Sequence, residues 1–388
     1  MTNELYFLSS LIASILNGEP SPQVPHELDW QKVFNMVVMN GFSVLVYERM
    51  KDIQGIPAQL LSSIDIKYKA GIRRSVLQEH YTNRILEQFE REGIRCLPLK
   101  GIILRKLYPK SFMRSMSDLD ILVDADKLRE TRRIMGELGF EVYRYDTHHD
   151  IYYTKSGVNV ELHKMLIVGE MENYFQIGFE RAYLKEDCKY TYEMSKEDFY
   201  IHMLGHMAYH FAYGGVGIRA VLDIQVYRKH YKNVLDHDYL KKELDKLGLF
   251  VFATHMEKLA AIWFTNEESN EFYDELGDYI VKSGYLGSQK HREVLEVVRQ
   301  SSTNVNKWIR IKAIITAIFL PYKSLAFSYP ILNKYPALLP VMWVARWIKI
   351  LRERKENVSR LRRLYWVEDV EIRRLGELYD KLGMRHLI

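Results

Sequence analysis

A change of hydrophobic pattern near Gly93 is the feature that most constrains the fold. Before it, apolar residues recur at helical spacing, with breaks at 18–25 and 55–57. After it come five short runs of strand length, at 94–99, 119–123, 140–145, 151–154 and 158–163. From residue 166 onward the helical spacing returns. These patterns predict an α+β chain, in which a small mixed sheet is embedded between N-terminal and C-terminal all-helical regions.

The same patterns divide the 388 residues into four regions. The α/β core is predicted over 91–165, after an N-terminal helical region over 1–90. A helical domain over 166–300 is expected to wall the cleft of the core, and a basic, aromatic-rich helical region follows over 301–388. The two cysteines, Cys96 and Cys188, are too few and too far apart for a disulfide scaffold or a CxxC-type zinc site.

The C-terminal region differs from the rest of the chain in charge. The net charge is +5, but residues 303–367 hold 13 Lys and Arg against two acidic residues. This excess predicts peripheral contact with a membrane or another polyanion through 303–367. Three interpretations stay open: a core-packed amphipathic helix with a solvated basic face, an interfacial membrane helix, and an RNA-contacting face. Glu4 stands where a secretory signal carries Lys or Arg, so we expect a cytoplasmic protein.

Acidic residues are placed on two of the predicted strands. Asp118 and Asp120 are two residues apart, so both carboxylates project from the same side of a strand. On the last strand, Glu161 and His163 share one face. If the two strands are neighbours, three carboxylates converge and can hold two Mg²⁺ or Mn²⁺ ions. The alternatives are solvated acids at a strand edge and a surface pair of Glu161 with His163.

A basic turn precedes these strands. Lys100 and Gly101 stand where a strand passes into a helix, and glycine there allows backbone N–H groups to approach an anion. The Lys100 ammonium is suited to phosphate. Arg114 and Ser117 lie in the loop before Asp118 and can reach the same phosphates. A phosphate-binding turn beside metal-binding acids predicts a nucleoside triphosphate site.

Further polar residues are candidates for the wall of a cleft. His202, His206 and His210 share one helix face, without the glutamate that an HExxH metal motif needs. We interpret them as a face packed near the cleft, with His206 or His210 in reach of nucleotide or acceptor. Arg219 and Asp223 are four residues apart and can pair along a helix, or Arg219 can reach phosphate.

Three blocks of this sequence, LKGIILRKLYP, RSMSDLDILV and VNVELHK, resemble the bacterial nucleotidyltransferase family of the DNA polymerase β-like superfamily. Segments at 40–50, 206–227 and 320–351 are also similar to that family. The resemblance implies Asp118, Asp120 and Glu161 as catalytic metal ligands, and Lys100-Gly101 as the phosphate turn. It departs from the superfamily pattern at Ile102, which leaves no serine after the glycine.

The resemblance implies metal-dependent transfer of a nucleoside monophosphate from an NTP, with ATP expected, to an acceptor hydroxyl with release of pyrophosphate. The acceptor (a small molecule, a protein or RNA) is not implied. Two alternatives remain. One is a glycosyltransferase that holds a sugar nucleotide at Asp-x-Asp, although such folds place several βα units before the acidic pair. The other is a catalytically inactive scaffold.

Overall fold

The computed structural model describes residues 1–167, 169–175, 178–284 and 289–299, and beyond them 311–312, 315–316, 318–322, 325–326, 329, 331–352, 366 and 368–388. The chain forms two compact units. The first comprises residues 1–209 and 216–285, and the second comprises 210–215 and 286–388. The four regions predicted from the sequence stay a prediction.

Four helices open the first unit: α1 (Asn3–Asn17), α2 (Trp30–Met39), α3 (Ser43–Met50) and α4 (Ala58–Arg91). Local capping sets their ends. Asp29 accepts hydrogen bonds from the first backbone N–H groups of α2, as an N-cap carboxylate does. Helix α1 ends at Gly18, which adopts a left-handed conformation with φ of 72° that glycine tolerates best. The helices thus follow the breaks predicted from the sequence.

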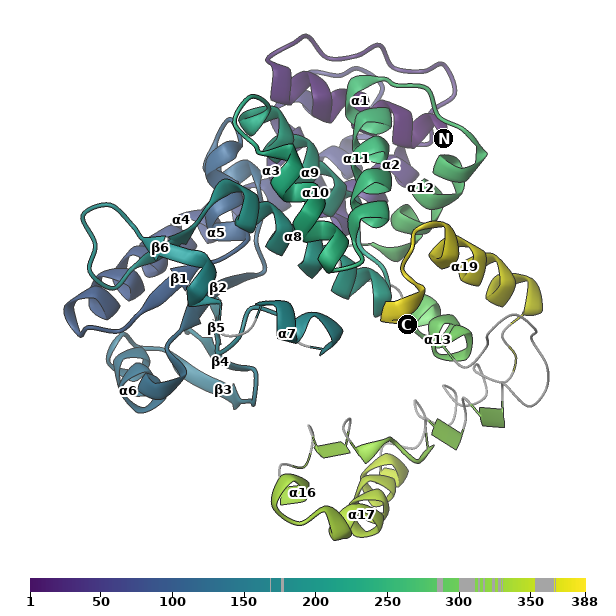
Figure 1. Cartoon of the computed structure of the whole chain (residues 1–388). Helices are drawn as coiled ribbons and strands as arrows, with labels where there is room; N and C mark the ends of the chain where they lie inside the picture. Colours follow the sequence, from purple (N-terminus) through teal and green to yellow (C-terminus); the bar gives the residue numbers. More distant parts are fainter. Residues whose placement is uncertain are drawn as a thin grey trace. The chain divides into compact units, whose positions relative to one another are not determined.

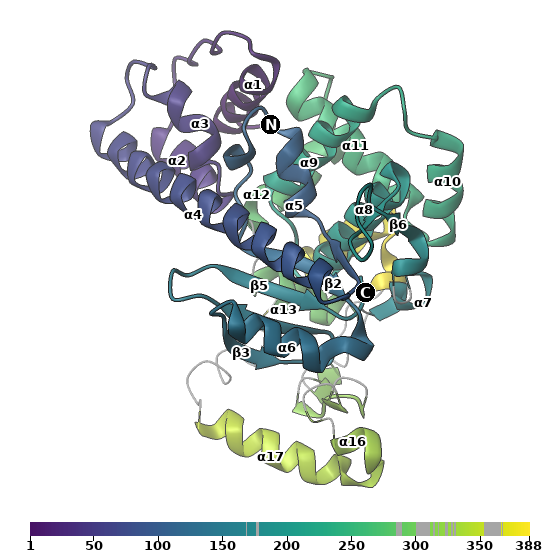
Figure 2. The ribbon, with the colours of Figure 1, turned by 90° about the vertical axis from the view of Figure 1, so that its left-hand side faces the viewer.

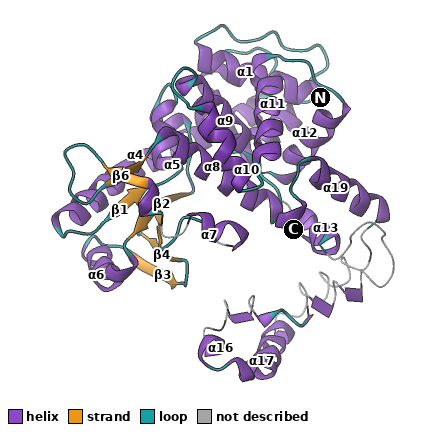
Figure 3. Ribbon diagram, viewed as in Figure 1, coloured by secondary structure: helices purple, strands orange, loops and turns teal. Residues whose placement is uncertain are grey.

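A five-stranded mixed sheet lies in the middle of this unit, in the order β1-β2-β5-β4-β3. Its strands are β1 (Cys96–Pro98), β2 (Asp118–Val123), β3 (Glu141–Tyr145), β4 (His149–Tyr153) and β5 (Asn159–His163). Strands β2 and β5 pair in parallel, whereas the other neighbours are antiparallel. Figure 3 shows these strands gathered in one part of a mostly helical unit. The predicted α+β fold with an embedded mixed sheet is confirmed.

The two faces of the sheet have different roles. Apolar side chains of β2 and β5, including Leu119, Ile121 and Val160, are fully buried with side chains of α4 and of α6 (Leu128–Glu137). Figure 2 shows α4 and α6 beside the sheet. Because side chains alternate along a strand, this packing directs Asp118, Asp120, Glu161 and His163 to the opposite face. The core therefore fixes which side chains form the polar face.

A second, two-stranded sheet was missed by the sequence analysis. Strands β6 (Ala182–Leu184) and β7 (Tyr192–Met194) lie in a region predicted to be helical. Each is three residues long, too short to show an alternating pattern. The turn beside β7 is held by Glu90 of α4. Its carboxylate accepts hydrogen bonds from the backbone N–H groups of Lys189, Tyr190 and Thr191.

The other helices of the first unit are α5 (Gly101–Leu104), α7 (Glu172–Phe175), α8 (Lys196–Ala212, whose last three residues belong to the second unit), α9 (Ile218–Tyr231), α10 (His237–Lys246), α11 (Phe250–Thr265) and α12 (Glu271–Ser283).

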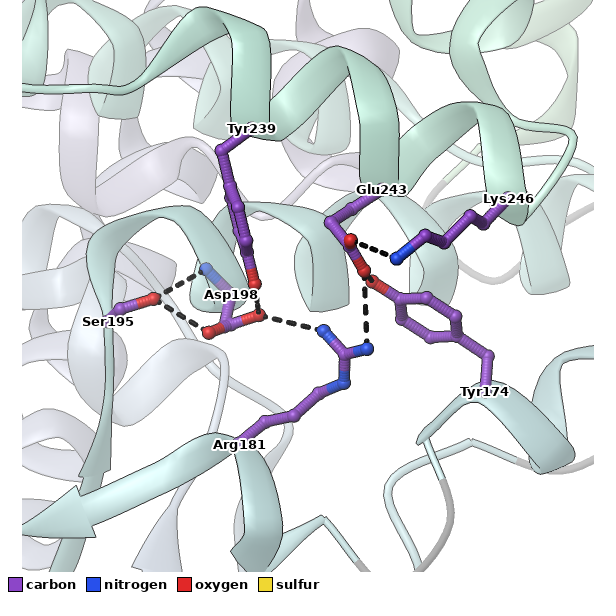
Figure 4. Close-up of polar contacts among 7 residues, drawn as sticks. All are labelled: Tyr174, Arg181, Ser195, Asp198, Tyr239, Glu243 and Lys246. Carbon is purple, nitrogen blue, oxygen red and sulfur yellow. Dashed lines mark hydrogen bonds and ion pairs between the residues drawn. The ribbon is translucent and has the colours of Figure 1, made fainter.

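A polar network ties the segment after the sheet to α8 and α10 (Figure 4). Arg181 donates to Asp198 at 3.1 Å and to Glu243 at 3.2 Å. The Tyr174 hydroxyl also donates to Glu243, at 2.7 Å. The network therefore fixes the chain as it leaves the sheet.

Glu243 makes this network dependent on pH. Burial alone would raise the pKa of its carboxyl, but hydrogen bonds from Lys246, Tyr174 and Arg181 lower it from 4.5 to about 2. A lowered folded-state pKa stabilises the protein above pH 4.5, and that contribution is lost as the pH falls toward 2. In Glu243→Gln we expect the free energy of unfolding at pH 7 to fall by roughly 2 kcal/mol.

Urea unfolding between pH 3 and pH 7 measures this effect. The stability of the wild type should fall more steeply with decreasing pH than that of Glu243→Gln. Glu268→Gln removes an exposed carboxylate and should follow the wild type. Parallel curves for wild type and Glu243→Gln would contradict the role assigned to Glu243.

The second unit contains α13 (Gln289–Val298), α16 (Ile331–Lys334), α17 (Leu339–Arg352) and α19 (Asp369–Lys381) among its described residues. The indoles of Trp343 and Trp347 donate hydrogen bonds to the backbone of 318–320 and pack on the ring of Phe319. The side of α17 that carries Trp343 and Trp347 is therefore packed, and the three interpretations of the basic region stay open. Val344 and Ile348, on α17, are each about half exposed.

Much of the basic run lies outside the described residues, including Arg354, Lys355, Arg360, Arg362 and Arg363. The expected contact of 303–367 with a membrane or another polyanion stays a prediction. In the part of the chain that the structure describes, no helix is both long enough and apolar enough to cross a membrane.

Candidate metal and nucleotide site

The pairing of β2 with β5 places the predicted carboxylates on adjacent strands. Asp118 lies opposite Asn159 in the parallel register, and Asp120 lies opposite Glu161. The predicted convergence of the three acids required these strands to be neighbours, and they are. Asp120 is buried, with 7% of its surface exposed, while Asp118 and Glu161 are half-buried.

Asp120, Glu161 and His163 form a compact group of potential metal ligands. One ligand atom from each lies within 4.8 Å of the others. His163 Nε2 is 2.7 Å from Asp120 Oδ1 and 3.9 Å from Glu161 Oε2. Asp118 is not a member of this group, although it shares the face. His163 thus contacts the buried acid directly, rather than forming only a surface pair with Glu161.

Lys100 reaches the same acid from another direction. Its Nζ is 3.4 Å from Asp120 Oδ2, the oxygen that His163 does not contact. The Lys100 backbone has φ of 40°, a conformation that costs energy for a residue with a side chain and is often found at functional sites. The turn therefore holds the ammonium at the carboxylate cluster, between the end of β1 and the start of α5.

Gly101 is required by close packing. A Cβ atom at this position would lie 2.6 Å from Met116 Sδ and 2.7 Å from the Arg114 guanidinium. A side chain at this position would require the Met116 and Arg114 side chains to move. The helix that begins at Gly101 is a single turn, so it adds little of the helix dipole that the sequence analysis assigned to this turn.

The acids influence one another electrostatically. Burial and the charge of Asp120 raise the pKa of Asp118, and burial with the charges of Asp120 and Asp118 raises the pKa of Glu161. For Asp120, burial alone would raise the pKa, but the Lys100 charge and the His163 hydrogen bond hold it well below its ordinary value. Asp120 is therefore the firmly ionised member, whereas the nearby cationic groups only partly offset the charges of Asp118 and Glu161.

Arg114 is fixed by an ion pair with the helical part of the unit. Its guanidinium donates two hydrogen bonds to the carboxylate of Asp223 on α9, at 2.9 and 2.8 Å. The hydroxyl of Tyr108 donates to the same carboxylate at 2.8 Å. Arg219, also on α9, donates to the carbonyl of Ser115 at 2.8 Å. Arg219 and Asp223 thus both bind the loop before β2.

The remaining candidates differ in burial and in the groups that they contact. Ser117 hydrogen-bonds to Asp118. His206 is half-buried on α8, and His210 is exposed and belongs to the second unit. Neither is a member of the ligand group found among the described residues. His202 is fully buried, and burial together with the charges of Lys100 and His163 lowers its pKa to about 3.

His149 was missed by the sequence analysis. It lies on β4 opposite His163 on β5, and its Nε2 is 3.8 Å from Glu161 Oε2. The hairpin around Lys155–Gly157 contained the necessary signal, because a turn centred on Ser156 places residue 149 opposite residue 163.

The donor set fits a divalent cation. Two ligand atoms that bind one ion at about 2.1 Å lie roughly 3.0 Å apart when adjacent and about 4.2 Å apart when opposite. The separations of 3.9 Å between His163 and Glu161 and 3.8 Å between His149 and Glu161 are within that range. His163 Nε2 and Asp120 Oδ1, at the hydrogen-bond distance of 2.7 Å, would move slightly apart to bind one ion. The excess negative charge on Asp118 and Glu161 favours the same ligand.

The site has an acidic pair on one strand, a third acid on the neighbouring strand and a lysine at the preceding turn. This is the arrangement that the resemblance to nucleotidyltransferases implied. The chain belongs to a family of uncharacterised nucleotidyltransferases, whose model matches residues 26–265. The match includes the whole sheet and ends at the last residue of α11, so the similar segment at 320–351 lies outside it. No curated protein and no solved structure matches the chain.

Proposed function

We propose that this chain transfers a nucleoside monophosphate from an NTP, with ATP expected, to an acceptor hydroxyl and releases pyrophosphate. The observation that carries the proposal is the convergence of Asp120, Glu161 and His163 within 4.8 Å, beside the ammonium of Lys100. Membership of a nucleotidyltransferase family supports the reaction class.

Each residue has a role in this proposal. The metal ion, Mg²⁺ or Mn²⁺, would be held by Asp118, Asp120 and Glu161. His163 lies at the same metal position. The bound metal lowers the pKa of the attacking hydroxyl and stabilises charge on the phosphates and the leaving group. Lys100, already at Asp120, would place its ammonium against the same phosphates. Gly101 keeps the turn close to Met116 and so holds Lys100 in place.

Arg114 and Ser117 act in this proposal from the loop before β2. The bidentate ion pair of Arg114 with Asp223 fixes that loop, and any contact of Arg114 with phosphate would be made from this fixed position. Ser117 orients Asp118. His206, His210, Arg219 and Asp223 stay candidates for the cleft.

The alternative glycosyltransferase is disfavoured by the order of the sheet. Only β1 precedes the Asp-x-Asp strand in it, whereas a sugar-nucleotide fold places several βα units there. Glu161, the partner of Asp120 across the ladder, also has no role in that reaction.

Incubation with NTPs labelled at either the α or the γ phosphate tests the proposal. With Mg²⁺ or Mn²⁺ and a cell lysate as the source of acceptor, the α label should pass to an acceptor and the γ label should appear in pyrophosphate. Glu161→Gln should transfer neither label to a product. Transfer of the γ label to an acceptor would indicate phosphoryl transfer and contradict the proposal.

A further inference from the structure

The metal group includes nitrogen as well as oxygen donors. His163 Nε2 lies within hydrogen-bonding distance of Asp120 and 3.9 Å from Glu161. His149 Nε2 lies 3.8 Å from Glu161 Oε2, and the two imidazole rings are 5.5 Å apart. Both histidines are mostly buried, with side-chain exposures of 23% for His149 and 13% for His163. The Glu161 carboxylate therefore has one other carboxylate, that of Asp120, and two imidazoles around it.

The choice of ion follows from these donors. Mg²⁺ prefers oxygen ligands and retains several of its waters, whereas imidazole is a ligand of divalent transition metals. A site that bound Mg²⁺ alone would gain nothing from two ring nitrogens next to its acids. We infer that this site binds a divalent first-row transition metal in preference to Mg²⁺, with His163 as a direct ligand and His149 as a second nitrogen donor.

The pairing of the strands fixes the positions of these four donor side chains. His149 and His163 form a pair across the β4–β5 ladder, and Asp120 is paired with Glu161 across β2–β5. Three adjacent strands thus hold the four side chains, and none of the four depends on a mobile loop. The Lys100 ammonium lies next to Oδ2 of Asp120, and the other oxygen, Oδ1, lies next to His163.

The inference rests on the proposed function, because it concerns the same metal-dependent site, but it is tested without NTP or acceptor. Purified full-length protein is titrated with Mn²⁺, and bound Mn²⁺ is measured by electron paramagnetic resonance. Pulsed spectra should show coupling to an imidazole ¹⁴N nucleus. A 100-fold excess of Mg²⁺ should displace less than half of the bound Mn²⁺.

Matched variants assign the nitrogen. His163→Gln should remove the principal ¹⁴N coupling and weaken Mn²⁺ binding at least ten-fold, and His149→Gln should weaken it less. His80→Gln replaces an exposed histidine of α4 and should behave like the wild type. Circular dichroism and thermal unfolding establish that each variant is folded.

Three outcomes would overturn the inference: no Mn²⁺ binding, binding without ¹⁴N coupling in the wild type, or displacement by an equal concentration of Mg²⁺. The proposed function is judged separately. Transfer of the α label with Mg²⁺ alone, together with oxygen-only Mn²⁺ binding, would overturn the metal preference and leave the reaction standing. Nitrogen-coordinated Mn²⁺ without transfer from any NTP would do the opposite.

Discussion

Asp120→Asn is expected to reduce nucleotidyl transfer by about 10³-fold or more, because metal stabilisation of the transition state is worth several kcal/mol. Of the three acids, Asp120 is the one whose pKa is held below its ordinary value, and both His163 and Lys100 contact it. Asparagine has nearly the same shape but lacks the charge that a divalent cation requires. Transfer of the α label under saturating NTP and metal measures the loss.

The control for this variant is Asp126→Asn, which removes an exposed carboxylate from the same α/β region. Its activity should equal that of the wild type. Circular dichroism and thermal unfolding should show that Asp120→Asn is folded. Transfer within ten-fold of wild type in a folded Asp120→Asn protein would remove this residue from the catalytic site.

Asp223→Ala is expected to lower the free energy of unfolding by roughly 3–5 kcal/mol, because it leaves a buried arginine without its counter-charge. The side chains of Arg114 and Asp223 are only 9% and 7% exposed, and they join at 2.8 Å. The Tyr108 hydroxyl loses its acceptor in the same variant. Denaturant unfolding at pH 7 measures the change.

Two further variants test whether the unpaired buried charge causes this loss of stability. The double variant Arg114→Met with Asp223→Leu removes both charges and should recover most of the stability, since the cost comes from the unpaired ion. Asp278→Ala breaks the exposed pair with Lys282 and should cost less than about 1 kcal/mol. A loss for Asp223→Ala no larger than for Asp278→Ala would contradict the structural role. If the stable double variant still lacks transfer activity, Arg114 acts on the nucleotide as well.

Local sequence was sufficient to predict the strands that carry the site. The alternation of Val158, Val160 and Leu162 with Glu161 and His163 gave the correct faces of β5, because a strand has a period of two. The helix breaks at glycine and proline were also predictable. By contrast, β6 and β7 are three residues each and leave no periodic signal.

Contacts between distant segments were not predictable from one sequence. The ion pair of Arg114 with Asp223 joins residues 109 apart, and neither neighbourhood contains a sign of the other. The spacing of Arg219 and Asp223 instead suggested a local pair. Lys100 was predicted for phosphate, but its contact with Asp120 depends on the unusual backbone of a single residue. His149 is the exception, since the symmetry of its hairpin would have located it.

The parallel pairing of β2 with β5 also has a kinetic meaning. Strands β4 and β5 are joined by a short turn, so His149, Glu161 and His163 come together through a local contact. Asp120 reaches Glu161 only when β2 docks beside β5, and these two paired residues are 41 positions apart in the sequence. Such non-local pairings form late and slowly because a long loop must close first. We therefore expect the complete set of ligands to exist only after the slow step of folding, so that an incompletely folded chain holds the two histidines without the buried acid.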